Sequence, residues 1–204
     1  MALYVLARHG ESVLNQERRV NGDPSVPAPL TKRGRENAAL LGLELRGLPL
    51  DACVHTRFGR TLETAQIALD GRDIPLVEEA LLDDVRIGEL EGWTVDEYRD
   101  WKHGRTRADR FPGGESLDEA AHRYAEAYRR LLERRDEYVL VICHEIPIRY
   151  ALNAIGDSDD LDGPVHLIPN ATPFLFGEKA LAAAAERIDR LASPNRGPET
   201  RSPR

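Results

Sequence analysis

Short, unbroken apolar runs recur along the chain, each followed by a stretch in which apolar residues repeat at helical spacing. Runs of Val, Leu, Ile, Cys and Tyr without polar interruptions are typical of strands buried on both faces of a parallel sheet. The pattern predicts strands at residues 3–7, 50–56, 74–77 and 138–143, with a closing strand pair at 165–168 and 172–176.

Capping residues mark the expected beginnings of the helices. Thr31 can cap one helix, and Thr94 and Ser116 each have a Glu three residues later, which is the pattern of a capping box. The pattern predicts helices at residues 31–46, 60–69, 94–102, 116–132, 147–155 and 179–191. Because strands alternate with helices, we expect an α/β fold, a three-layer αβα sandwich with a mostly parallel central sheet.

Polar stretches rich in Gly and Pro separate some of these elements. Residues 12–29, 81–93 and 103–115 have the composition of loops, and long loops beside a site are often functional. Residues 193–204 contain three Pro and three Arg, which predicts a disordered tail after a single catalytic domain at 1–192.

Composition narrows the class of protein. The 204 residues are 41% hydrophobic and 31% charged, with a net charge of -7 and no long basic block, which disfavours nucleic-acid binding. We expect no membrane partner, because no apolar run approaches the ~18 residues that span a bilayer. We also expect no signal peptide, because no basic region followed by an apolar one stands at the N-terminus. Cys53 and Cys143 lie in apolar runs, which favours reduced thiols in a cytoplasmic protein. Whether the chain forms a homodimer is left open.

Two histidines stand directly after predicted strands. Arg8, His9 and Gly10 follow the first strand, and His144 follows the strand at 138–143. Open α/β sheets bind ligands at the carboxyl ends of their strands. A guanidinium is suited to binding phosphate, and an imidazole can serve as a nucleophile or a base.

These residue types are the ones that phosphoryl transfer requires. The reaction depends mainly on positioning and charge stabilisation, which Arg forks and imidazoles can supply. A neutral imidazole can attack phosphorus, and a carboxylic acid with a raised pKa can protonate the leaving alkoxide. Neither step needs a metal or another cofactor, so we predict neither, with a small phosphorylated molecule as the partner.

The motifs resemble those of the histidine phosphatase superfamily, which includes the cofactor-dependent phosphoglycerate mutases and many small phosphatases. Arg8-His9-Gly10 is similar to the signature of that family. Further similar segments follow in the same order: Asn15 and Gly22, then 30–34 (L-T-K-R-G), 60–65 (R-T-L-E-T-A), 88–92 (G-E-L-E-G), 112–116 (P-G-G-E-S) and 139–144. The resemblance implies a phosphoglycerate mutase-like fold and a phosphohistidine mechanism.

The same resemblance implies a role for each matching residue. His9 would be the phosphorylated nucleophile, and Glu11 would orient its neighbours. The phosphoryl group would be held by Arg8, Arg60 and His144, with contacts from Asn15 and Gly22. Asp84 stands at the position of the proton donor of the family, where many members have Glu. Three other carboxylates remain alternatives for this role: Asp83, Glu115 and Glu145.

Glu145 departs from the family pattern, which usually has Gly after the second histidine. A Glu145 side chain that points inward would repel an anion and weaken substrate binding. We nevertheless predict that Glu145 is one of the residues that contact the substrate. A side chain that points away would affect only the loop. The sequence leaves both outcomes open.

Other functional hypotheses remain. Cys143 and Arg149 have the C-x5-R spacing of cysteine-based phosphatases, although Pro147 removes a backbone donor from that loop. A phosphate-binding module without turnover is a second alternative, and a mutase is a third. We predict a phosphatase acting on a small phosphomonoester, because a mutase must shield its phosphohistidine from water and mutases of the family are usually longer.

Several further charged residues are uncertain on sequence alone. Arg57 could reach the substrate from its place near Arg60. The basic cluster between two helices is either solvated or an anion-steering rim, and the remaining histidines are expected to be ordinary surface or core residues. The cluster is Arg105, Arg107 and Arg110, and these histidines are His55, His103, His122 and His166.

Overall fold

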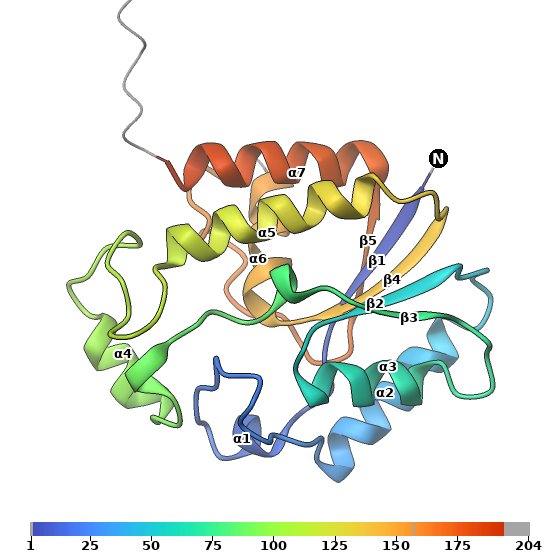
Figure 1. Cartoon of the computed structure of the whole chain (residues 1–204), viewed down its shortest axis with the longest axis horizontal. Helices are drawn as coiled ribbons and strands as arrows, with labels where there is room; N and C mark the ends of the chain where they lie inside the picture. The colour runs from blue at the N-terminus through green and yellow to red at the C-terminus, as the bar shows by residue number, and fades with distance from the viewer. Residues whose placement is uncertain (1, 157, 194–204) are drawn as a thin grey trace, which may run out of the picture.

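A five-stranded sheet forms the centre of the computed structural model, which describes residues 2–156 and 158–193 (Figure 1). The strand order is β3-β2-β4-β1-β5, and all neighbouring strands are parallel except β5, which runs antiparallel to β1. The strands are β1 (Leu3–Arg8), β2 (Ala52–His55), β3 (Leu76–Glu78), β4 (Tyr138–Cys143) and β5 (Pro173–Gly177). The mostly parallel α/β fold predicted from the sequence is confirmed.

Helices cover both faces of this sheet (Figure 1). One layer consists of α2 (Lys32–Glu44) and α3 (Gly59–Ala68), and the other of α5 (Leu117–Leu132), α6 (Glu145–Ile155) and α7 (Glu178–Leu191). The connections contain the short elements α1 (Val13–Gln16), η1 (Ala80–Leu82), η2 (Gly88–Leu90) and α4 (Val95–Lys102). None of the helices within the described ranges is long and apolar enough to cross a membrane.

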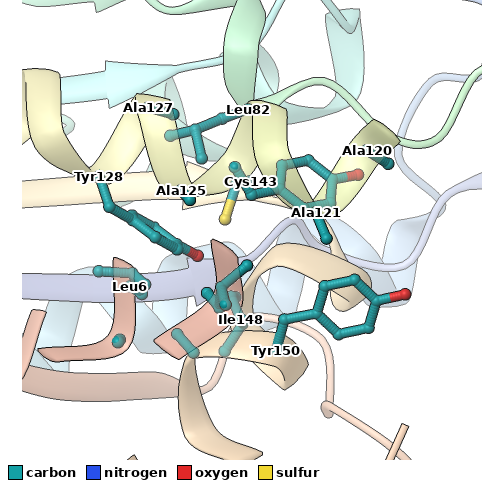
Figure 2. Packing of buried hydrophobic residues seen from close by; sticks show 14 of the residues in the cluster. Leu6, Leu82, Ala120, Ala121, Ala125, Ala127, Tyr128, Cys143, Ile148 and Tyr150 are labelled. Carbon is teal, nitrogen blue, oxygen red and sulfur yellow. The ribbon is translucent and has the colours of Figure 1, made fainter. Parts of the chain in front are cut away.

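The apolar strands fill two cores, one on each side of the sheet. Tyr4 and Leu6 of β1 pack toward α5, α6 and α7, whereas Val5 and Ala7 pack toward α2 and α3, as the two-residue period of a strand requires. Figure 2 shows the first core, in which Leu6 lies among side chains of α5 and α6. Burial on both faces explains why β1 and β4 are apolar up to the carboxyl end of β1, where Arg8 stands.

Most of the predicted helix starts are confirmed. Thr31 accepts a hydrogen bond from the Gly34 amide, and the boxes that begin at Thr94 and Ser116 are both formed. The helix predicted at 147–155 begins earlier, at Glu145, with His144 as its N-cap.

Two predictions about the irregular segments are wrong. Residues 165–168 do not form a strand: of the two predicted segments only the second does, as β5 at 173–177, so no closing strand pair is present within the described residues. Residues 165–168 instead run past the end of the sheet, where the Ile168 carbonyl accepts a hydrogen bond from Arg8. The predicted loop at 12–29 contains α1, which a capping box of Ser12 and Asn15 stabilises. Of the predicted tail, only Ser193 lies within the described residues, so disorder there stays a prediction.

The sheet register explains how residues far apart in sequence meet. Arg8 is paired with Cys143, and the His9 amide donates to the Cys143 carbonyl over 3.0 Å, so His9 and His144 leave adjacent strands side by side. On the other side of β4, His55 is paired with Ile142, which brings Thr56 to the same edge. The candidate site lies at this edge.

Candidate active site

The two histidines predicted from the strand ends face each other across a buried site. His9 and His144 are 2% and 0% exposed, and their ring centroids lie 5.4 Å apart. This separation allows both imidazoles to contact one tetrahedral anion. The predicted convergence of the strand ends is therefore confirmed.

The hydrogen bonds of His9 define its tautomer. Nδ1 lies 2.7 Å from the Gly10 carbonyl oxygen, which can only accept, so the proton is assigned to Nδ1. Nε2 then has a free lone pair and accepts from Arg60 Nε over 3.0 Å. Burial, reinforced by the charges of Arg60 and Arg8, holds the pKa of His9 well below its usual value. The ring is neutral at physiological pH, which is the state a nucleophile needs.

His144 is fixed by a chain of hydroxyl groups. Arg60 Nη2 lies 3.2 Å from Nδ1 and can only donate, so the ring proton is assigned to Nε2, 3.0 Å from Thr56 Oγ1. The Thr56 hydroxyl lies 2.9 Å from that of Thr61, which donates to the Phe58 carbonyl. Burial and the nearby charge of Arg60 lower the pKa of His144 well below its usual value, so this ring is also neutral.

Arg60 projects from the first turn of α3 and connects the two histidines. Its side chain is 4% exposed, and its guanidinium carbon lies 4.2 Å from the centroid of the Phe58 ring. It also donates to the Asn21 side-chain oxygen. Burial lowers the pKa of Arg60 to about 10, so it keeps its charge at neutral pH. A buried cation with several donors is suited to binding phosphoryl oxygens.

Arg8 approaches the site from the end of β1. Its Nη1 donates to the Ile168 carbonyl over 2.8 Å and lies 2.7 Å from Glu145 Oε2. Its buried Nε has no hydrogen-bond partner among the described residues. The question about Glu145 is thus answered: its side chain points inward and pairs with the predicted phosphate-binding arginine.

The four candidate acids occupy different environments. Asp84 Oδ2 lies 3.5 Å from both Arg60 Nη2 and His144 Nδ1, and burial raises its pKa despite the opposing charge of Arg60. Asp83, 3% exposed, is held by the Arg57 amide and guanidinium outside the cavity.

Glu115 is also committed to structural contacts. Burial would raise its pKa, but hydrogen bonds from Arg123 and Arg86 together lower it, so this carboxylate stays ionised. Asp84 and Glu145 are the two candidate acids that line the cavity.

A cavity of about 390 Å³ opens from these groups. Its inner end is formed by Arg8, His9, Arg60 and Asp84, together with Asn15 and Glu145. The outer walls combine apolar side chains, including Ile87, Tyr98 and Leu167, with the cations Arg19, Arg99, Lys102 and Arg149. The site can accommodate a phosphate with a sizeable organic group attached.

The loop after α1 closes one side of the cavity. Glu91 accepts from the Asn21 side chain over 2.6 Å and from the amides of Gly22 and Asp23 over 2.7 and 3.0 Å. Gly22 packs against Val85 behind the cavity lining, where a Cβ would come within 2.0 Å of the Val85 carbonyl oxygen. Asn15 lines the cavity while its side-chain oxygen accepts from the Ser12 amide.

The comparison with known families agrees with this geometry. A model of the histidine phosphatase superfamily (branch 1) matches residues 4–172. The chain belongs to this family. The match includes every residue that forms the site described above.

Individual relatives of this family member carry different names. The 2,3-bisphosphoglycerate-dependent phosphoglycerate mutase 2 of Gloeobacter violaceus is 33% identical over 167 residues, which cover 74% of each chain. The structure of Bacillus stearothermophilus YhfR has a TM-score of 0.74 at 28% identity and covers 87% of this chain and 91% of its own. The alpha-ribazole phosphatase of Shigella flexneri shares the fold, with a TM-score of 0.73 at 21% identity over 86% and 90% of the two chains.

Other residues singled out from the sequence lie elsewhere. Cys143 is fully buried in the core shown in Figure 2, and burial raises the pKa of its thiol, which argues against a cysteine nucleophile. Glu11 accepts from the Thr31 hydroxyl over 2.9 Å, and Arg57 pairs with Asp83. None of the three described arginines of the basic cluster lines the cavity, and Arg107 is not solvated but pairs with Asp118 and Asp162.

The roles of five residues that shape the site were not predicted from the sequence. Thr56 and Phe58 hold His144 and Arg60, and Glu91 anchors Asn21. Glu91 belongs to the G-E-L-E-G motif and Asn21 precedes Gly22, so the motifs marked both positions without showing what they touch. His166, expected to be an ordinary histidine, lines the cavity. No group of three His, Cys, Asp or Glu within residues 2–156 and 158–193 could hold a metal ion.

Proposed function

We propose that the protein is a phosphatase that hydrolyses a small phosphomonoester through a phosphohistidine on His9. The observation that supports this most directly is the neutral His9 ring, whose unprotonated Nε2 faces Arg60, while His9, Arg60 and Asp84 line one cavity. A nucleophile, phosphate-binding cations and an acid therefore surround one volume.

The proposed reaction has two steps. In the first, His9 Nε2 forms a bond to phosphorus while the bond from phosphorus to the ester oxygen breaks, and Asp84 gives its proton to the leaving alkoxide. Arg8 and Arg60 stabilise the charge on the phosphoryl oxygens during transfer, and His144 joins them when its ring proton lies on Nδ1, the nitrogen that faces Arg60. In the second, Asp84, now ionised, takes a proton from a water molecule that attacks phosphorus, and inorganic phosphate leaves with His9 neutral again.

Mutase activity is the second candidate. The name of the Gloeobacter relative and the cations of the outer wall favour it, because a phosphoglycerate carries a carboxylate besides its phosphate. Hydrolysis is favoured by Glu145 and Asp84, two carboxylates that line the cavity. They would oppose a bisphosphorylated intermediate, which a mutase must retain until it reacts again.

Replacing the nucleophile tests the proposal. We expect His9→Ala to release no phosphate from any member of a panel of phosphomonoesters, because the attacking lone pair is gone. The wild type should form an acid-labile, alkali-stable phosphoenzyme when mixed rapidly with labelled substrate, and the variant should form none. His103→Ala, at an exposed position, is the control and should retain full activity.

Three outcomes would contradict the proposal. Normal hydrolysis by His9→Ala would exclude His9 as the nucleophile. Faster interconversion of 2- and 3-phosphoglycerate than phosphate release by the wild type would identify a mutase. Vanadate binding without turnover of any phosphomonoester would instead identify a binding module.

A further inference from the structure

Glu145 places an extra negative charge beside the phosphoryl site. It is the first residue of α6, directly after His144, and its side chain is 25% exposed at the cavity wall. One carboxylate oxygen lies 2.7 Å from Arg8 Nη1. The charge is therefore held close to where the ester oxygen of a bound substrate would lie, and not at the distant rim.

The second oxygen of Glu145 is available to a ligand. It lies 3.8 Å from Arg149 Nη1, which is beyond hydrogen-bond distance. A carboxylate has about four acceptor sites, so a single contact with Arg8 leaves capacity for further donors.

Arg149 neutralises Glu145 only in part, because it is also bound to another carboxylate. Burial raises the pKa of Glu145, and the charges of Arg8 and Arg149 oppose that rise. Arg149 Nη2 lies 2.6 Å from Asp162 Oδ1, and Asp162 Oδ2 lies 2.7 Å from Arg107. Arg107 also donates to the Tyr150 hydroxyl over 3.0 Å. This network of residues from α6 and the loops holds Arg149 in place, so the wall beside Glu145 is fixed.

We propose that Glu145 determines substrate specificity by favouring phosphomonoesters that carry only hydroxyl or amine groups near the phosphate and rejecting those that carry a second anion within one or two carbons of it. The inference rests on the phosphatase activity proposed above. A hydroxyl or ammonium group can donate to the free oxygen of Glu145. A carboxylate at the same place would be repelled, and solvent screens that repulsion only in part because the Glu145 side chain is 25% exposed.

The surrounding charges are consistent with such a local effect. Asp84 adds a second carboxylate on the same inner part of the cavity, while Arg8 and Arg60 are needed for the phosphoryl oxygens. Two cations of the outer wall, Arg99 and Lys102, belong to α4, and Arg99 Nη1 lies 3.8 Å from Asp96 Oδ1. A second anion could be accepted there only if a longer substrate carried it away from the phosphate.

Glu145→Gln removes the charge and keeps the shape of the side chain. The kinetics of three small substrates should be compared: glycerol 3-phosphate with hydroxyls, phosphoethanolamine with an amine, and 3-phosphoglycerate with a carboxylate. We expect the ratio of kcat/KM for 3-phosphoglycerate to that for phosphoethanolamine to rise by about 10- to 100-fold in the variant, mainly through KM. Glu126→Gln, a carboxylate on the exposed part of α5, is the matched control and should leave the ratio unchanged.

A structural role for Glu145 would give a different result. An equal loss of kcat/KM for all three substrates would overturn the proposal. So would a loss of kcat for all three with full activity on p-nitrophenyl phosphate, because a good leaving group needs no acid and this pattern would make Glu145 the proton donor. Glu145→Gly provides a second variant without the charge, and its ratio should change in the same direction if Glu145→Gln unfolds.

The experiments distinguish a protein without phosphatase activity from a Glu145 without a role in specificity. If the wild type hydrolyses none of the phosphomonoesters, the proposed function is wrong. Calorimetric binding of the same three compounds to the wild type and to Glu145→Gln then decides the inference. An unchanged ratio of dissociation constants would overturn it, and a rise in relative affinity for 3-phosphoglycerate would support it.

Discussion

Arg60 is the residue whose contacts connect the other groups of the site. It donates to His9 Nε2 and lies within hydrogen-bond distance of His144 Nδ1, so one guanidinium faces the lone pairs of both imidazoles. Its charge also helps to keep both rings neutral and opposes the rise in the pKa of Asp84. A phosphoryl group entering the cavity would accept these hydrogen bonds and free His9 Nε2 for attack.

The pH dependence of catalysis follows from the states of His9 and Asp84. The first step needs neutral His9, whose pKa is lowered, and protonated Asp84, whose pKa is raised. Activity should therefore fall below the pKa of His9 and fall again as the pH rises through that of Asp84. We expect Asp84→Asn to lower kcat for alkyl phosphates by roughly 10²- to 10⁴-fold and to remove the alkaline limb. Steady-state kinetics across pH would measure this, and an unchanged alkaline limb would assign the acid to another group.

At the scale of elements, the site is assembled from the ends of three adjacent strands and one loop. The strand ends are held by the sheet ladder, whereas the loop at 17–29 depends on Glu91 and on close packing against the segment after Asp84. Figure 1 shows α1 and α4 to the left of α2 and α3, away from the strands of the sheet. The position of the loop therefore depends on how closely its backbone packs against the segment after Asp84.

Gly22 tests how closely that loop must fit. In Gly22→Ala, the new Cβ would lie 2.0 Å from the Val85 carbonyl oxygen, so the backbone must move and take Asn21 away from Arg60. We expect a loss of about 1–3 kcal/mol in the free energy of unfolding and a higher KM for every phosphomonoester. Denaturant titration and kinetics would measure both. Gly47→Ala, where no atom lies within 4 Å of the added Cβ, should change neither.

For the whole molecule, the two buried, neutral imidazoles of the site lower the free energy of unfolding at acidic pH. The pKa of each is lowered in the folded state, so below pH ~6.5 the unfolded chain binds protons that the folded chain does not. The free energy of unfolding therefore falls with acidification from that point until the folded-state pKa is reached. Its slope is about 1.4 kcal/mol per pH unit for each such histidine.

Comparison with a variant isolates one of these histidines. In His9→Asn, one of the two histidines no longer contributes to the pH dependence of the free energy of unfolding. Relative to the wild type, the free energy of unfolding of this variant should therefore rise by about 1.4 kcal/mol for each unit that the pH falls below ~6.5. Urea titrations at several pH values would measure the difference. His103→Asn, at an exposed position, should run parallel to the wild type. Parallel curves for His9→Asn as well would contradict a neutral, buried His9.

Those parts of the molecule that depend on local patterns could be predicted from the sequence. The apolar runs, the capping boxes and the order of the motifs identified the sheet, most helices and the residues at the strand ends. The strand predicted at 165–168 was wrong, because an apolar segment of that length fits either a strand or a loop packed against the sheet. The role of Thr56 was equally hidden, since its contact with His144 spans 88 positions in the chain.

The sequence by itself determined that His9 and His144 follow buried strands, because an unbroken apolar run is a property of consecutive residues. Only the tertiary structure decided between Asp83 and Asp84, since these neighbours point to different surroundings, one to Arg57 and the other into the cavity. It also decided the direction of Glu145, because a side chain at a helix start turns toward whichever charge the rest of the fold brings near, and here that charge is Arg8.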